Sequence, residues 1–449
     1  MDSPAPDLKL DYKKTLLIGF GFFGTSVMWK LYNDYVPIFL QAGNPLFDAS
    51  LATRANGFGL GPGLTGFIMT VDNIVALFLL PLIGLWSDRI WLPKVGGRRK
   101  PFIAALAPIS ILAFIFIPFI VRMIPPELSG MTDELRQPLS LFIISVGIFI
   151  TAMAGFRTPV ISLMPDLTPS PLRSQANGVI NLMGGLGGVI ITLVGAFLYD
   201  VNIALPFIVS GVLMALAVVM LFFFVQEPRD LSEEGEVREG EEALSALKGV
   251  RQIGGASIVS LLLLMLSIFL WFVGYNAIET FFTSYGVNIL GIRENQAALL
   301  SSISYITFIL FAIPSGYIAG RLGRRKTITI GLVVFAGLLL LGYLLPNIYV
   351  IGTALALGGC AWAMVNINSL PMVIDSASSD ANIGTYTGFY YIASQLAAIT
   401  GPVLSGQVIE RTANYGLVLL MPVIFFVLAS ITMSGVTRGE ARTHSQSVS

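Results

Sequence analysis

Two similar stretches of sequence decide the fold of this chain. The first, GLWSDRIWLPKVGGRRKPFI at 84–103, ends one apolar run and begins the next. The second, GYIAGRLGRRK at 316–326, does the same about half the chain later. Both place a glycine and an arginine at the end of an apolar run and then repeat the tetrapeptide Gly-Arg-Arg-Lys. The recurrence predicts that one unit of several membrane spans is used twice.

Composition indicates a protein that crosses a membrane many times. Hydrophobic residues make up 55% and charged residues 12% of its 449 residues, whereas soluble domains have about 25% charged residues. A helix needs about 20 apolar residues to cross a bilayer, and twelve such runs can be marked. They are 15–40, 63–86, 101–123, 139–163, 174–198, 203–225, 256–281, 296–319, 327–346, 350–374, 384–409 and 414–436.

A long polar stretch divides these runs into two sets of six. We therefore expect an N-terminal six-helix half at 1–226, an acidic linker at 227–252, and a C-terminal half with a short tail at 253–449. Lys and Arg lie mostly in the loops on the side that would hold both termini, and this bias predicts that both termini are cytoplasmic. The exceptions, on the other side, are Arg54, Arg122, Arg136, Arg293 and Arg411.

Charge and residue counts exclude several classes of function. The 26 basic and 26 acidic residues balance, so no field favours a nucleic-acid partner. With one cysteine, Cys360, and one histidine, His444, we expect neither disulfides nor a metal site. No nucleophile–base set indicates an enzyme. The Gly-x-Gly-x-x-Gly pattern at 19–24 lies inside an apolar span, so we interpret it as helix packing rather than dinucleotide binding.

The stretch 84–103 resembles the loop between spans two and three of the major facilitator superfamily. Its Ser-Asp-Arg…Gly-Arg-Arg-x-Pro-Phe-Ile form is similar to the sucrose/proton symporter and glycoside–cation symporter branch, and 157–185 and 366–402 fit the same branch. The resemblance implies an all-α integral membrane protein, the major facilitator fold, with twelve transmembrane helices in two pseudo-symmetric six-helix halves. It also implies a cytoplasmic gating motif that latches the halves together in the outward-open state.

The gating residues are Gly84, Asp88, Arg89, Gly97, Arg98, Arg99, Arg321, Arg324 and Arg325. Asp88 can face a helix N-terminus, where a carboxylate is favoured by about 0.3–1 kcal/mol. Arginines can bridge carboxylates or lipid phosphates. The alternative is that these residues are ordinary cytoplasmic charges that follow the positive-inside bias.

Charged side chains inside spans are costly and indicate function. At about 1.5 Å per residue from the span centres, Lys30 matches Asp72 in depth, and it lies four residues before Asp34. Because no histidine lies within a span, proton coupling needs a carboxylate. We predict Asp72 as the coupling acid, with Asp34 in reserve and Lys30 as the partner. A structural Lys30 ion pair is the alternative, and Glu279 is expected at the membrane edge.

Polar side chains inside the spans form a candidate substrate site. Amides offer paired donors and acceptors to a hydroxyl-rich ligand, and aromatic faces can cover the C–H surface of a sugar ring. The candidates are Asn33, Asn73, Arg157, Asn181, Asn276, Asn366, Tyr391 and Gln395. Interhelical hydrogen bonding is the alternative for any single asparagine.

These features predict a secondary active transporter in the cell inner (plasma) membrane. We expect H⁺- or Na⁺-coupled symport of a sugar or glycoside by alternating access, by a monomer in contact with membrane lipid and with no cofactor beyond the coupling ion. The alternative is a proton-driven antiporter that exports small amphipathic compounds, whose cavity would be more apolar and aromatic. A solute sensor would need an added signalling domain, for which the tails and the linker leave little room.

Overall fold

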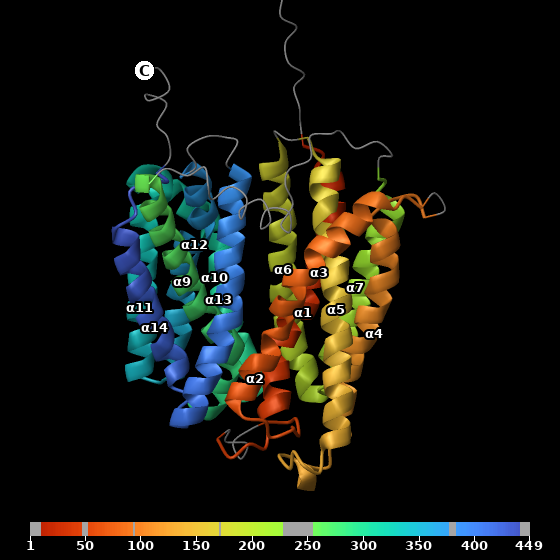
Figure 1. Cartoon of the computed structure of the whole chain (residues 1–449). Helices are drawn as coiled ribbons and strands as arrows, with labels where there is room; N and C mark the ends of the chain where they lie inside the picture. Colours follow the sequence, from red (N-terminus) through yellow and green to blue (C-terminus); the bar gives the residue numbers. More distant parts are fainter. Residues whose placement is uncertain are drawn as a thin grey trace, which may run out of the picture. The chain divides into compact units, whose positions relative to one another are not determined.

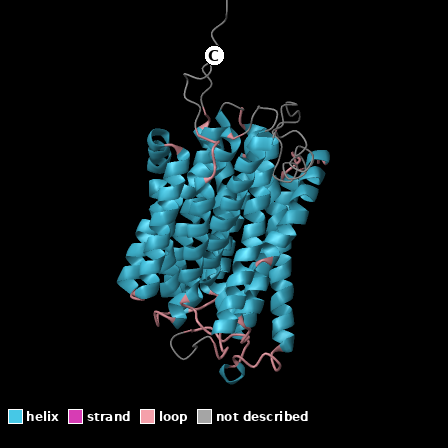
Figure 2. Cartoon of the chain, turned by 60° about the vertical axis from the view of Figure 1, so that its left-hand side comes forward, coloured by secondary structure: helices cyan, strands magenta, loops and turns pink. Residues whose placement is uncertain are grey.

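The computed structural model describes residues 10–46, 53–92, 95–169, 172–227, 255–376 and 383–440. These residues are helical apart from loops, turns and an isolated bridge between Leu92 and Gly97 (Figure 2). The helices are α1 (Tyr12–Gln41), α2 (Pro62–Met69), α3 (Val71–Arg89), α4 (Lys100–Arg122), η1 (Pro126–Leu128), α5 (Arg136–Leu167), α6 (Arg173–Val201), α7 (Leu205–Phe224), α9 (Gly255–Asn288), α10 (Glu294–Leu322), α11 (Arg324–Leu344), α12 (Ile348–Asp375), α13 (Ile383–Thr412) and α14 (Leu417–Ser434). Apart from Glu227, nearly all of the predicted linker lies outside the described residues.

The helices confirm the predicted all-α, multi-span fold. Within the described residues, 11 helical stretches are long and apolar enough to cross a membrane. The remaining long helix, α1, has 30 residues and carries Lys30 and Asp34. The predicted second span contains two helices, because α2 ends and α3 begins on either side of Thr70.

The seventh predicted span ends much later in the structure than the sequence predicts. We expected 256–281, whereas α9 continues to Asn288. Thr283 and Ser284 lower the hydropathy of this last part, yet both are buried, and the Ser284 carbonyl accepts a hydrogen bond from the Asn288 amide at 2.8 Å. The helix therefore ends where its packing ends rather than where the apolar run ends.

Contacts divide the chain into two compact units, which we call unit 1 and unit 2. Unit 1 comprises Met1–Leu31, Phe78–Phe119 and Phe142–Arg238. Unit 2 comprises Tyr32–Leu77, Ile120–Leu141 and Glu239–Ser449. Unit 2 thus holds the C-terminal helices, the whole of α2, and one end each of α1, α3, α4 and α5. The division into halves at 1–226 and 253–449 stays a prediction.

Close helix packing in unit 1 confirms our interpretation of the glycine pattern in α1. A Cβ atom on Gly21 would lie 2.5 Å from Val160, and one on Gly24 would lie 2.5 Å from the Met214 sulfur. Because side chains there would clash, these glycines allow α1 to approach its neighbours. The pattern binds α1 to the other helices of its unit.

In unit 2, the C-terminal helices lie side by side (Figure 1, green to blue). α9 packs against α13 and α14, α12 packs against α10 and α11, and α2 packs against α13. A buried core with Trp271, Phe335 and Phe426 holds these helices together. Within each unit, we call the helix ends beside its own Gly-Arg-Arg-Lys loop the basic face of that unit, and the other ends its opposite face.

Candidate functional site

Three neighbouring helices of unit 2 carry the predicted substrate residues of the C-terminal half. Asn276 lies on α9, Asn366 on α12, and Tyr391 and Gln395 lie one turn apart on α13; all four are half-buried. The Asn276 amide donates to the Phe272 carbonyl at 2.7 Å. Within the described residues, the structure gives the Asn366 and Gln395 side chains no hydrogen bond.

Aromatic rings lie on the same three helices as this polar group. Tyr275 stacks on Trp362 with ring centroids 4.1 Å apart and an angle of 4°. Phe272 contacts Trp362 edge-on at 5.7 Å and Tyr390 at 6.2 Å, and Tyr390 contacts Tyr391 at 5.5 Å. The rings join α9, α12 and α13 and can contact either a sugar ring or an apolar solute.

A carboxyl–phenol pair lies beside these rings. The Tyr305 hydroxyl on α10 donates to Glu279 Oε1 on α9 at 2.6 Å. At about 1.5 Å per residue, Glu279 lies about 9 Å from the middle of the candidate span Ile258–Asn288. The longer α9 thus places Glu279 inside the span rather than at its edge, where we expected it.

The predicted coupling acids lie in the part of unit 2 that comes from the N-terminal spans. The Asn73 amide donates to Asp72 Oδ1 at 2.9 Å, so these neighbours bind each other. Asp72 is close enough for its charge to act on the Tyr32 phenol. Asp34 is 4% exposed, and the neighbouring Asn33 is half-buried.

Three other predicted site residues belong to unit 1. Lys30 is 8% exposed and lies one turn before Asp34 on α1; its pairing with Asp34 or Asp72 would join the two units and stays a prediction. Arg157 on α5 and Asn181 on α6 are exposed. The Asn181 amide donates to the Asn177 carbonyl and side chain, both at 2.8 Å, which fits helix packing as well as ligand binding.

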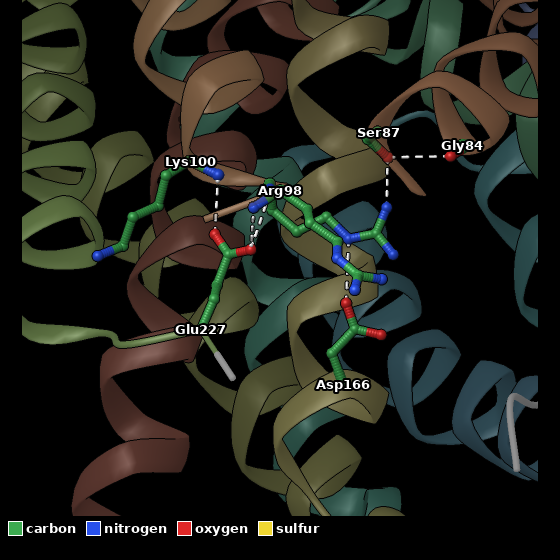
Figure 3. A network of polar contacts seen from close by, with 7 residues as sticks. Gly84, Ser87, Arg98, Lys100, Asp166 and Glu227 are labelled. Atoms are coloured by element: carbon green, nitrogen blue, oxygen red, sulfur yellow. Dashed lines mark hydrogen bonds and ion pairs between the residues drawn. The ribbon is translucent and has the colours of Figure 1, made fainter. Parts of the chain in front are cut away.

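The first Gly-Arg-Arg-Lys loop is held by a carboxylate that sequence reasoning did not single out. Glu227, after α7, accepts the backbone N–H groups of Arg98 at 2.6 Å and of Arg99 and Lys100 at 2.9 Å (Figure 3). These are orphan donors at the start of α4, where the helix dipole also favours a negative charge. We expected Asp88 in such a role; its side chain and that of Arg89 lie outside what the structure describes.

Arg99 joins this loop to the ends of two helices. Its side chain is fully buried, and its Nε lies 3.0 Å from Asp166 Oδ2 at the end of α5. It also donates to the Ser87 hydroxyl, which donates to the Gly84 carbonyl at 3.0 Å (Figure 3). Burial raises the pKa of Asp166, while the charge of Arg99 and its hydrogen bond oppose that rise.

Gly97 is required by the same contact. A Cβ atom there would lie 2.3 Å from Glu227 Oε1, too close for any other residue without moving the carboxylate. The neighbouring Arg98 guanidinium lies 5.9 Å from the centroid of the Trp91 ring, a cation–π contact. The glycine that opens the tetrapeptide therefore has a steric reason in the first copy of the loop.

The second copy of the loop makes an equivalent network in unit 2. Glu440, after α14, accepts the backbone N–H groups of Arg324 at 2.7 Å and Arg325 at 3.1 Å. The Arg324 side chain pairs with Asp375 at the end of α12. Arg325 donates to a backbone carbonyl at the end of α14. Arg321 instead lies over the Tyr317 ring, 4.4 Å from its centroid.

On the opposite face, buried polar groups tie the end of α1 to the C-terminal helices within unit 2. Gln41 is 0% exposed; its Nε2 donates to the Ser284 hydroxyl at 3.1 Å, and its Oε1 accepts from the Tyr415 hydroxyl at 2.6 Å. Glu410 on α13 accepts the Gly63 N–H at the start of α2 at 2.8 Å. We call Gln41, Ser284, Tyr415, Gly63 and Glu410 the opposite-face latch.

Glycines let α2 and α13 meet closely beside this latch. A Cβ atom on Gly66 would lie 2.2 Å from the Pro402 carbonyl oxygen, and one on Gly406 would lie 2.3 Å from the Pro62 carbonyl oxygen. Larger residues would separate the helices. The sequence shows these glycines, but not that each lies against the backbone of the other helix.

Curated relatives align with this chain over different shares of their length. The tetracycline resistance protein, class E, of Escherichia coli is 21% identical over 347 residues, 76% of each chain. The proton-associated sugar transporter A of Homo sapiens is 26% identical over 190 residues, 42% of this chain and 23% of that protein. The first alignment therefore spans most of both proteins, and the second covers only a part.

The fold has close counterparts among solved structures. A mutant of the nucleoside transporter NupG superposes with a TM-score of 0.70 at 15% identity, covering 95% of this chain and 100% of that one. A sequence model of the Major Facilitator Superfamily matches residues 15–293 and 287–448. The chain belongs to the Major Facilitator Superfamily, a family of membrane transporters rather than enzymes.

Proposed function

We propose that this transporter is a cation-coupled symporter of a sugar or glycoside. The observation that carries the proposal is the pair of half-buried amides, Asn366 and Gln395, which have no hydrogen bond within the described residues. A polar group left unpaired inside a span is costly, and a hydroxyl-rich solute would satisfy both amides. The Tyr275–Trp362 stack supplies aromatic surface beside them. The partial similarity to a proton-associated sugar transporter agrees with this solute class.

We propose Asp72 as the carboxylate that couples transport to H⁺ or Na⁺, with Lys30 as its partner and Asp34 in reserve. The hydrogen bond from Asn73 supports a fixed carboxylate at this position. Alternating access would rock the two halves about a central site, with the basic face of each unit in the cytoplasm, as the Lys and Arg bias favours. The networks around Glu227 and Glu440 would hold the helix ends on that face.

A second candidate function is proton-driven export of small amphipathic compounds. The observation that favours it is the cluster of contacting aromatic rings formed by Phe272, Tyr275, Trp362, Tyr390 and Tyr391. The similarity to a tetracycline resistance protein agrees with it. In the symporter the solute moves in the same direction as the cation, and in the exporter it moves against the proton. Only the sugar of the symporter needs amide donors in the site.

Uptake into proteoliposomes separates these functions. Purified protein is tested with a labelled disaccharide, a labelled nucleoside and tetracycline, under an imposed pH or Na⁺ gradient. We expect one gradient to drive accumulation of a sugar or glycoside. Asn366→Ala and Gln395→Ala should reduce that accumulation, whereas Gln137→Ala, at the exposed start of α5, should not. Tetracycline extrusion without sugar uptake would instead support the exporter.

A further inference from the structure

Glu279 is a carboxyl group inside a membrane span, and the described residues offer it no cationic partner. It is half-buried and lies about 9 Å from the middle of its span. Within the described residues, the structure gives it a hydrogen bond from Tyr305 and no ion pair. An ionised carboxylate at such depth is expensive unless a cation or a proton neutralises it. Neither the substrate site nor the coupling acids discussed above use this group.

The groups that face Glu279 are phenols and another acid. Tyr305 on α10 donates to it at 2.6 Å. Tyr275, one turn earlier on α9, hydrogen-bonds to Tyr305 and lies within electrostatic reach of Glu279. The charge of Asp34, on the part of α1 that belongs to unit 2, also acts on Tyr305. The phenol therefore lies under the influence of two carboxyl groups.

The described parts of the other helices packed on α9 bring no compensating charge to this position. α14 has no titratable residue along its length. The charged residues of the other helices lie at helix ends: Glu410 and Arg411 on α13, Asp375 on α12, and Glu294 and Arg321 on α10. Among the described residues, the titratable neighbours of Glu279 are thus the phenols and, through Tyr305, Asp34.

Tyr305 can serve both protonation states of Glu279. A phenol donates to an ionised carboxylate, and it can accept from a neutral carboxyl group while donating elsewhere. No polar atom need be left unpaired when a proton arrives or leaves. Hard cations such as Ca²⁺ or Mg²⁺ take about six oxygen ligands, and the described residues contain no cluster of acids that could hold a metal ion. This geometry suits a proton better than a metal cation.

We propose that Glu279 binds a proton, and that Tyr305 and Tyr275 relay its protonation state to the aromatic side of the substrate site. The proposal rests on the proposed function, since it adds a second carboxyl group to the coupling of transport. The proton enters as H⁺ onto a Glu279 oxygen and leaves from the same atom, and no covalent bond to carbon changes. Tyr275 stacks on Trp362, so a shift of the phenols would reach the ring surface beside Asn276.

Infrared difference spectroscopy tests proton binding directly, with or without a known solute. Full-length protein in proteoliposomes is titrated with acid, and the carbonyl band of neutral carboxyl groups is recorded. We expect one component of this band to disappear in Glu279→Gln and to change frequency in Tyr305→Phe, because the hydrogen bond is lost. The matched controls are Glu127→Gln, in an exposed turn, and Tyr349→Phe, 82% exposed; neither should alter that component.

Transport assays on the same proteins separate this inference from the proposed function. We expect Glu279→Gln to abolish gradient-driven accumulation while exchange at equal concentrations continues. Lack of sugar transport by the wild-type protein would refute the proposed function and leave the infrared test intact. Spectra of Glu279→Gln and Tyr305→Phe that match the wild type, or a band removed by Na⁺ instead of by alkali, would overturn the assignment. Should Glu279→Gln not fold, Tyr305→Phe decides by the same spectrum.

Discussion

Replacing Glu227 by alanine should loosen the start of α4 without unfolding the protein. The carboxylate accepts the three N–H groups of Arg98, Arg99 and Lys100, and it is half-buried. In Glu227→Ala these three N–H groups either donate to water or have no acceptor. The perturbation is local, because Glu227 follows the last turn of α7 rather than lying within a helix.

The expected magnitude follows from helix capping. Loss of a capping side chain costs about 0.5–2 kcal/mol, and loss of a negative charge near a helix N-terminus costs about 0.3–1 kcal/mol. Glu227 supplies both effects, but partial exposure screens its charge. We therefore expect about 1.4 kcal/mol, which is a tenfold change in an equilibrium constant. Glu227→Gln keeps one carbonyl acceptor and should show a smaller effect.

Hydrogen exchange at single-residue resolution measures this change. The amides of Arg98, Arg99 and Lys100 should exchange about ten times faster in Glu227→Ala, if local opening limits exchange. Amides in the middle of α4 should keep the wild-type rate. The second network provides the matched control: Glu440→Ala should speed exchange at Arg324 and Arg325 only.

The result that would refute this reasoning is equally specific. If Glu227→Ala leaves the three amides at the wild-type rate, the carboxylate does not cap α4 in solution. If exchange rises along the whole of α4, the contact stabilises the unit rather than the helix start. In either case Glu227 would lose its role in holding the loop.

Three further predictions concern helix ends within unit 1 and unit 2. Burial raises the pKa of Asp166, which follows the candidate span. The contribution of Asp166 to stability is therefore greatest at acid pH and is lost as the pH rises through that raised pKa. The thermal midpoint should show this pH dependence, and Asp166→Asn should remove it. Gly66→Ala places a Cβ atom 2.2 Å from a carbonyl oxygen of α13; we expect a loss of about 1–3 kcal/mol of stability, measured as a lower thermal midpoint. Gln41→Leu leaves the buried Tyr415 hydroxyl without its acceptor; we expect about 1–3 kcal/mol of lost stability, which Tyr415→Phe in the same protein should partly restore.

The sequence predicted the helices well because bilayer thickness and charged loops constrain them strongly. α4 begins at Lys100 and α12 ends at Asp375, within one residue of the predicted ends at 101 and 374. The break at Thr70 and the extension of α9 to Asn288 depend on packing against other helices. An apolar run carries no signal for either.

The candidate site was predicted by residue type and not by contact. Asn366 and Gln395 are candidates because amides offer paired donors and acceptors to a hydroxyl-rich ligand, and the structure places them on helices that pack together. Glu279 was expected at the membrane edge because its span was drawn too short. Its bond to Tyr305 joins two helices at a sequence distance of 26 residues, which no periodicity reveals.

Glu227 and Glu440 were missed for a different reason. Each is an acid a few residues beyond the last span of its half, where charged residues are ordinary. The signal was nevertheless present in the repeat: two Gly-Arg-Arg-Lys loops open helices, and the N-terminus of a helix needs acceptors. Glu227 and Glu440 hold equivalent positions after the last span of each half, from which each can reach the loop of its own unit.

The two networks also show that the repeat keeps an arrangement rather than a residue-by-residue match. In the aligned tetrapeptides Arg99 corresponds to Arg325, yet Arg99 pairs with Asp166, whereas Arg324 pairs with Asp375. The cause is the helix start: α4 begins at Lys100, but α11 begins at Arg324, directly after Gly323 with φ of +89°. Function should therefore be compared between Arg99 and Arg324, which share a place in the network, and not between residues that share a place in the alignment.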